Sequence, residues 1–193
     1  MPRTPTDTRE KILMVAKDLF YRYGVRAIGV DTIIAQSEVA KTTLYRYFPS
    51  KDDLVVAYLE LNDWYFWGLF DEVVNQSPQE ATQQLLAIFS WLDELIASPE
   101  CYGCPFLMVA SEFPEIDYPG HQVSIAHKQK LRDRLTELAR LSEIDAAEEL
   151  SATLLLLIDG AYVQRRLLGR HDNGVTLKKA AKIAIDAYKT GFE

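Results

Sequence analysis

Between residues 32 and 51 the chain carries a group of side chains that can donate hydrogen bonds to nucleic acid. Hydroxyl groups and cations of this kind bind phosphate oxygens and the edges of bases. The residues expected to reach base edges are Lys41, Thr42, Thr43 and Arg46. Those expected to bind phosphates and set the register are Thr32, Tyr45, Tyr47 and Lys51. We therefore expect double-stranded DNA as the partner of this stretch.

Two short helices must position these donors. The first carries apolar residues at the i, i+3, i+4 spacing of one buried helical face, namely Val30, Ile33 and Ile34. After a break at residues 37–38, a second helix is predicted over residues 40–48, with Leu44 and Phe48 on its inner face. Pro49 ends this helix because proline continues a helix poorly. Two short helices joined by a tight turn indicate a helix-turn-helix, whose second helix enters the major groove of DNA.

The segment TTLYRYFPSK, followed by DDLVVAYL, resembles the end of the recognition helix and the start of the next helix in TetR/AcrR-type transcriptional regulators. The upstream segment TREKILMVAKDLFYRYG is similar to the first helix of that family, so the resemblance covers roughly the first third of the chain. One position departs from the pattern, since members of the family usually carry glycine in the turn where this chain has Glu38. A non-glycine residue with positive φ costs about 1 kcal/mol, so we expect a slightly altered turn.

The resemblance implies an all-α protein with two parts. Residues 1–50 would form a three-helix DNA-binding head, and residues 51–193 a six-helix body for effector binding and dimerisation. It also implies a transcriptional repressor, released from its operator by a small hydrophobic or aromatic effector. Helical periodicity and capping signals continue along the body and no strand pattern competes, so about nine helices are expected in total.

Capping residues predict where the helices begin and end. The predicted starts are Asp7 with Glu10, Ser50 with Asp53, Ser77 with Glu80, Pro105, Asp145 with Glu148, and Thr176. The predicted stops include Gly24 and Gly191, because glycine favours the left-handed conformation that ends many helices.

The net charge of −7 is unevenly distributed along the chain. Residues 1–51 hold nine lysines and arginines against five acids, a net charge of +4, and the remainder carries −11. Since salt screens charges beyond about 10 Å, a basic head can bind phosphate locally on an acidic protein. Ordinary solvated charges would also explain this asymmetry, although they would not explain the motif. The sequence has no apolar run of about 18 residues and no apolar segment at its start, so a cytoplasmic location is expected.

Residues 145–168 form a predicted helix in which LLLLIDGAYV is apolar around most of its circumference. Such a helix is either buried in its own domain or shared with a partner chain. The TetR/AcrR resemblance implies that the last two helices pair with their copies in a homodimer. A dimer also suits DNA, because two recognition helices about one helical turn apart read a palindrome. The residues expected at this interface are Leu154, Leu157, Ala161, Ile183 and Ala187.

The same resemblance implies a ligand cavity beside the long helix that follows the head. An apolar cavity walled by aromatic residues would suit a small hydrophobic or aromatic molecule. At each of these positions, ordinary core packing is favoured over contact with a ligand. The residues expected to bind the effector are Trp64, Trp67, Phe89, Tyr102, Phe106, Met108, Tyr162 and Arg166.

Cys101 and Cys104 form a C-x-x-C pattern that suits a redox pair, half of a metal site or two inert buried thiols. A zinc site needs further ligands, and His121, His127 and His171 have no matching spacing, so no metal is expected. Thiol-based redox sensing on the same scaffold remains an alternative function.

Enzymatic chemistry has little support in the sequence. Pairs such as Ser111 with Glu112 lack the orienting third group of a catalytic site, and there is no glycine-rich phosphate loop. We therefore expect no catalytic residues and no cofactor. The alternative from another class is a helical binding module or enzyme without a DNA role.

Overall fold

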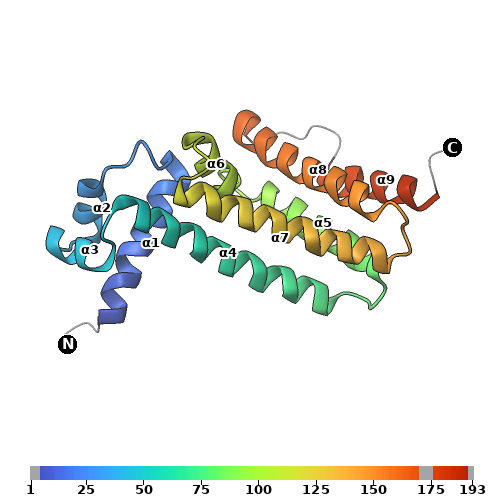
Figure 1. Ribbon diagram of the computed structural model, residues 1–193, viewed down its shortest axis with the longest axis horizontal. Helices are drawn as coiled ribbons and strands as arrows, with labels where there is room; N and C mark the ends of the chain where they lie inside the picture. The colour runs from blue at the N-terminus through green and yellow to red at the C-terminus, as the bar shows by residue number, and fades with distance from the viewer. Residues whose placement is uncertain (1–4, 170–175, 191–193) are drawn as a thin grey trace. The chain divides into compact units, whose positions relative to one another are not determined.

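The computed structural model describes residues 5–169 and 176–190, and within these ranges every regular element is an α-helix (Figure 1). The helices are α1 (Pro5–Tyr23), α2 (Val30–Ser37), α3 (Lys41–Tyr47), α4 (Lys51–Gln76), α5 (Ala81–Ala97), α6 (Pro105–Glu112), α7 (Pro119–Leu141), α8 (Ala147–Leu168) and α9 (Leu177–Thr190). The prediction of an all-α chain with about nine helices is therefore confirmed. In this part of the chain, no helix is both long enough and apolar enough to span a membrane.

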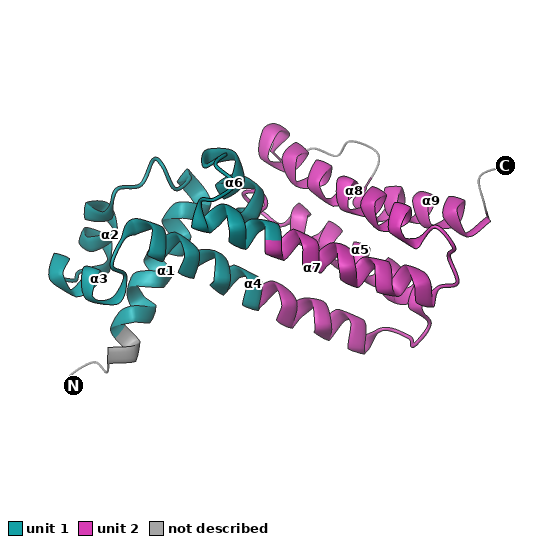
Figure 2. Cartoon of the chain, in the orientation of Figure 1, with its two compact units in different colours: residues 1–64, 105–125 teal, residues 65–104, 126–193 magenta. Residues whose placement is uncertain are grey.

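Internal packing divides the chain into two compact units (Figure 2). Unit 1 comprises Met1–Trp64 and Pro105–Ile125, and unit 2 comprises Tyr65–Cys104 and Ala126–Glu193. The division falls inside α4 and inside α7, so each of these helices has residues in both units. Unit 1 thus contains the three N-terminal helices together with α6. The functional boundary between residues 50 and 51 stays a prediction.

The core of unit 1 joins α1, α2, α3 and the beginning of α4. Its nearly completely buried side chains include Ile12, Ala16, Phe20, Ile33, Leu44, Phe48, Leu54 and Tyr58. Phe20 meets Tyr58 edge to face, with ring centroids 5.6 Å apart. Helices as short as α2 and α3 are unstable alone, whereas each large apolar side chain buried here contributes about 1.5–3 kcal/mol. Tertiary packing therefore holds the two short helices in place.

The caps predicted at the starts of α4 and α9 are confirmed. The backbone N–H of Ser50 donates to Asp53 Oδ2 at 2.9 Å, and the N–H of Asp53 donates to Ser50 Oγ at 3.1 Å, which is a reciprocal capping box. At α9, the N–H of Lys179 donates to Thr176 Oγ1 at 3.2 Å. Gly24 follows α1 with a φ of 88°, the left-handed stop that was expected there.

Other predicted helix starts are wrong. α5 begins at Ala81, and the hydroxyl of Ser77, its expected cap, donates instead to a carbonyl in the last turn of α4 at 2.7 Å. Serine makes such bonds to the preceding turn readily, and the bond removes its oxygen from the capping role. α1 begins at Pro5, ahead of the cap expected at Asp7. The stop predicted at Gly191 lies outside the described ranges.

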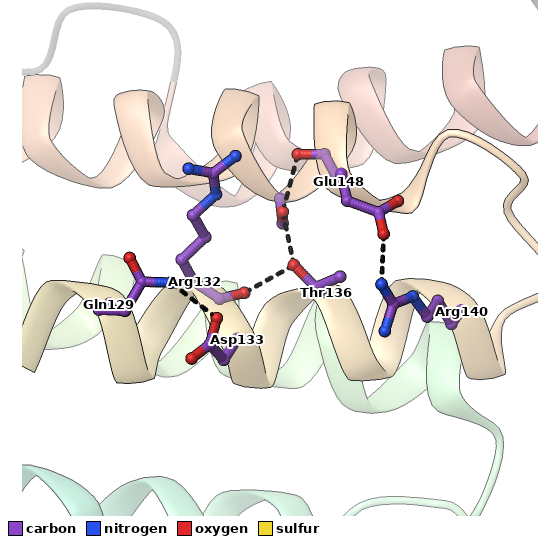
Figure 3. A network of polar contacts seen from close by, with 7 residues as sticks. Gln129, Arg132, Asp133, Thr136, Arg140 and Glu148 are labelled. Atoms are coloured by element: carbon purple, nitrogen blue, oxygen red, sulfur yellow. Dashed lines mark hydrogen bonds and ion pairs between the residues drawn. The ribbon is translucent and has the colours of Figure 1, made fainter.

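A network of polar side chains joins α7 and α8 within unit 2 (Figure 3). The hydroxyl oxygens of Thr136 and Ser151, both buried, are 2.7 Å apart. Arg140 pairs with Glu148, and the hydrogen bond from Arg140 is the main cause of the lowered pKa of the Glu148 carboxyl. The cap predicted from Asp145 with Glu148 is therefore wrong, because α8 begins without a side-chain cap and Glu148 faces α7. Satisfied hydrogen bonds between buried groups specify how two helices align.

Candidate DNA-binding site

Glu38 forms the turn between α2 and α3. Its φ of 53° and ψ of 40° lie in the left-handed region, which favours glycine. The N–H of Glu38 donates to the carbonyl of Ala35 at 3.3 Å, and the N–H of Val39 donates to that of Ile34 at 3.4 Å. These bonds satisfy carbonyls at the end of α2, as a glycine stop would. The helix-turn-helix therefore keeps a tight turn although its left-handed residue is a glutamate.

Replacing Glu38 with glycine is expected to raise the free energy of unfolding by about 0.5–1 kcal/mol, because the left-handed strain is relieved. The change also removes an exposed ion pair, in which Lys11 Nζ lies 3.1 Å from Glu38 Oε2. Exposed pairs contribute only about 0–1 kcal/mol, so the strain is expected to dominate.

Urea unfolding followed by circular dichroism measures this change. Glu137→Gly, at an exposed position inside α7, is the matched control and should lower the stability by about 1 kcal/mol. A Glu38→Gly protein that is also less stable than the parent would show that the turn is not strained.

α3 is a seven-residue helix with an apolar side and a donor side. Leu44 and the following Phe48 are buried on the apolar side, against the core of unit 1. Of the eight predicted DNA-binding residues, Thr32, Lys41, Thr42, Tyr45 and Arg46 are exposed, and Thr43, Tyr47 and Lys51 are half-buried. A helix with this division of side chains can lie in a major groove with its donors toward the bases.

Two cations of the donor face contact neighbouring side chains. Lys41 Nζ donates to Asp31 Oδ1 at 3.2 Å, and both side chains are largely exposed. Such a pair contributes at most about 1 kcal/mol, so Lys41 can exchange Asp31 for a group on DNA. The guanidinium of Arg46 lies 5.0 Å from the centroid of the Tyr47 ring. Contact with the ring restricts the orientation of the planar guanidinium of Arg46.

Lys51 opens α4, and its ammonium group contacts the connection between α1 and α2. The Nζ atom donates to the carbonyl of Val25 at 2.7 Å and lies 6.0 Å from the centroid of the Phe20 ring. Burial lowers the pKa of Lys51, and the charges of Glu112 and Asp52 act in the opposite direction. The phosphate contact of Lys51 stays a prediction, to which the structure adds an internal hydrogen bond.

No local feature of the sequence indicates that α6 contributes to unit 1. Glu112, the last residue of α6, accepts hydrogen bonds from the N–H of Val25 at 3.0 Å and from that of Arg26 at 2.6 Å. The hydroxyl of Tyr118 donates to Asp52 Oδ1 at 2.9 Å, and burial together with this bond raises the pKa of Tyr118. The bonds of Glu112 join residues 86 and 87 positions apart, so no local pattern reveals them.

The helix-turn-helix matches a family of known proteins. The family described as "Bacterial regulatory proteins, tetR family" matches residues 12–58, which run from α1 into α4. The HTH-type transcriptional regulator YjdC of Escherichia coli is 25% identical over 167 residues, which cover 84% of each chain. A crystal structure of a TetR-family transcriptional regulator from Streptomyces coelicolor has a TM-score of 0.83 and 29% identity, over 96% of this chain and 94% of that chain. The chain belongs to the TetR family.

Membership of the TetR family settles the class of function. The protein is a DNA-binding transcriptional regulator, and the prediction that it is not an enzyme is confirmed. The alternative of a helical module without a DNA role is wrong for the same reason. Another relative, the HTH-type transcriptional repressor NemR of Escherichia coli, is 26% identical over 110 residues, which cover 56% of this chain and 55% of NemR.

The effector-binding residues predicted for this TetR-family chain are divided between the two units. Trp64, Phe106 and Met108 belong to unit 1, and Trp67, Phe89, Tyr102, Tyr162 and Arg166 belong to unit 2. Trp64 is 68% exposed, so its ring faces solvent to a large extent. In unit 2, Arg166 Nη1 donates to the carbonyl of Tyr102 at 3.2 Å. The remaining aromatic residues of the set in unit 2 are buried.

Aromatic rings from α4, α5 and α7 form a cluster in unit 2. The Phe66 ring centroid lies 5.3 Å from those of Trp67 and Trp91, and 4.9 Å from that of the buried His127. Lys130 Nζ lies 4.1 Å from the centroid of the Trp67 ring. Of these residues only Trp67 was predicted as a ligand contact. One face of the Trp67 ring is therefore in contact with the ammonium group of Lys130.

The outer face of α8 carries large apolar side chains. Leu156, Val163 and Leu167 are 73%, 56% and 77% exposed, and their i, i+7, i+11 spacing places them on one face. Leu154, predicted at the dimer interface, is completely buried within its own chain and cannot lie on this surface. Of the other predicted interface residues, Ile183 is exposed, and Leu157, Ala161 and Ala187 are half-buried.

Cys101 and Cys104 are both buried thiols between α5 and α6. Reactive thiols are usually accessible to the oxidant, so burial of both sulfurs does not favour the redox-sensing alternative. Among the described residues, no group of three or more His, Cys, Asp and Glu side chains is arranged to hold a metal ion.

Proposed function

We propose that this TetR-family regulator is a homodimeric repressor that binds a palindromic operator and leaves it when a small hydrophobic or aromatic effector binds. The proposal rests on α3, where the donors Lys41, Thr42, Tyr45 and Arg46 are exposed while Leu44 is buried on another side of the helix. Lys41, Thr42, Thr43 and Arg46 are assigned to base edges, and Thr32, Tyr45, Tyr47 and Lys51 to phosphates.

Dimerisation is supported by the apolar face of α8. Exposed apolar surfaces of this kind on a soluble domain usually mark an interaction site. A Cβ added at Gly160 would meet nothing within 4 Å, so this exposed position leaves room for a second helix. The proposed interface consists of Leu156, Leu157, Ala161, Val163 and Leu167 on α8, with Ile183 and Ala187 on α9. Two such chains would present two recognition helices to a palindrome.

Repression and its release are supported by two further observations. The similarity to the repressor NemR favours a repressor over an activator. The aromatic cluster of unit 2, in which the Phe66 ring contacts those of Trp67, Trp91 and His127, supplies apolar rings for an effector site. An effector must bind better to the state that fits the operator poorly, since only a difference in affinity can shift the equilibrium.

Selection of bound fragments from the source genome tests the proposal. The selected fragments should share a palindrome whose half-sites lie about 10 base pairs apart or a multiple of it. Fluorescence anisotropy with one such duplex, against unrelated competitor DNA, then gives the specific affinity. A panel of small aromatic compounds is added to the complex, and at least one class should raise the dissociation constant. If the selected fragments share no palindrome and are bound no better than competitor DNA, the proposal of a palindromic operator is wrong.

A further inference from the structure

Charged side chains bind both backbone groups of Val25, which lies just after α1. Its N–H donates to Glu112 Oε1 at 3.0 Å, and its carbonyl accepts a hydrogen bond from Lys51 Nζ at 2.7 Å. The next N–H, that of Arg26, donates to Glu112 Oε2 at 2.6 Å. Since Glu112 ends α6 and Lys51 opens α4, the start of the α1–α2 connection is fixed to two other helices of unit 1.

The position of Glu112 is unfavourable for α6 itself. A carboxylate at the C-terminal end of a helix meets the partial negative charge of the unpaired carbonyls there. The two N–H groups and the nearby positive charge of Lys51 compensate for this repulsion. The chain also leaves room for the carboxylate, because a Cβ added at Gly24 would lie 2.7 Å from Glu112 Oε1. The general preference against an acidic residue at the C-terminal end of a helix is thus outweighed by a long-range contact. Such exceptions often occur at functional positions.

Aromatic contacts connect the same segment to α4 by a second route. The guanidinium of Arg26 lies 4.9 Å from the centroid of the Phe113 ring. Phe113 stacks on Tyr118 at 4.3 Å, with 11° between the ring planes. The hydroxyl of Tyr118 donates to Asp52 in the first turn of α4. Hydrogen bonds and ring contacts therefore form a continuous set around the α1–α2 connection.

The α1–α2 connection leads directly into the helix-turn-helix. Only residues 24–29 separate α1 from α2, and α2 packs on α3 through the buried core that contains Ile33 and Leu44. We propose that Glu112 is a positioning residue for DNA recognition, which sets the angle of α2 and α3 by holding the N–H groups of Val25 and Arg26. The inference rests on the DNA-contacting role proposed above for α3.

Two physical effects of Glu112 on DNA binding have opposite signs. An acidic group near the binding face repels phosphates, so its removal alone would tighten binding. Loss of the bonds to Val25 and Arg26 would misplace α2 and α3, and so weaken binding. The variant Glu112→Gln removes the charge and one of the two acceptor oxygens with almost no change of shape, so the sign of its effect separates the two roles.

The test measures operator affinity by anisotropy at several salt concentrations, together with amide hydrogen exchange by NMR. Glu112→Gln is expected to bind operator about tenfold more weakly, with an unchanged salt slope because no phosphate contact is lost. The amides of Val25 and Arg26 should exchange faster than in the parent. Glu115→Gln, an exposed acid three residues away, is the control and should bind as the parent does or more tightly.

Operator binding by Glu112→Gln at or above the parental affinity, with faster exchange at Val25 and Arg26, would overturn the positioning role. If Glu112→Gln does not fold, Tyr118→Phe breaks the same set of contacts at the bond to Asp52 and should weaken binding severalfold. If the parent itself does not prefer operator to competitor DNA, the proposed function fails. Glu112 is then judged by amide exchange alone, and unchanged exchange throughout α2 and α3 would overturn its role.

Discussion

Replacing both Leu156 and Leu167 with lysine is expected to separate the proposed dimer and to weaken operator binding by on the order of 100-fold or more. The two leucines are 73% and 77% exposed in the single chain, so the substitutions should leave its own core intact. In a twofold dimer each leucine occurs twice, and burying one contributes about 1.5–3 kcal/mol. Lysines at these positions would remove that gain and bring like charges together.

Light scattering measures the mass of the variant, and anisotropy measures its affinity for the operator. The matched control replaces Ile116 and Leu141 with lysine, since these residues are 67% and 65% exposed but lie outside α8 and α9. The control should remain dimeric and bind DNA normally. A dimeric Leu156→Lys, Leu167→Lys protein would contradict the α8 interface. A monomer that binds the full operator with parental affinity would contradict the need for a dimer.

The helix-turn-helix can be predicted from sequence because its determinants are local. Ile33 and Leu44 lie at helical spacing from other apolar residues, and both are completely buried in the structure. Pro49 correctly marks the end of the second helix, since α3 stops at Tyr47. The altered turn expected at Glu38 is not found, because Glu38 adopts the left-handed conformation that a glycine would have there.

The orientation of α8 cannot be predicted in the same way. The segment LLLLIDGAYV is apolar on nearly every side, so no polar stripe marks the solvent face. Leu154 and Leu156 are equivalent by residue type, yet Leu154 is completely buried and Leu156 is largely exposed. Contacts of α8 with α5 and α9 decide between them, and those contacts depend on the assembled fold.

The role of α6 in unit 1 is unpredictable for a related reason. Glu112 meets Val25 and Arg26 only after the chain has folded, across 86 or 87 positions of sequence. From the neighbouring sequence alone, a glutamate at the end of a short helix would be expected to be an ordinary exposed acid. The cap predicted at Ser77 is wrong for the converse reason, because its hydroxyl makes a competing bond to the preceding turn.

Replacing Arg46 with alanine is expected to lower affinity for the specific operator by about 10- to 100-fold, and to leave affinity for unrelated duplex DNA within about threefold of the parent. Arg46 is exposed on the donor face of α3, and its guanidinium is oriented by contact with the Tyr47 ring. A planar guanidinium can donate two parallel bonds to one base edge, which a smaller side chain cannot replace. Arg46→Lys should be intermediate, because lysine keeps the charge but loses the planar fork.

Anisotropy with operator and scrambled duplexes, each over a range of salt, measures both quantities. Arg132→Ala, which removes an exposed arginine of α7 in unit 2, is the matched control and should change neither. An equal loss on both duplexes, with a salt slope smaller by about one, would instead make Arg46 a phosphate contact. The two outcomes are separable because the salt slope counts the phosphates that are neutralised. Base readout changes only the ratio of specific to non-specific affinity.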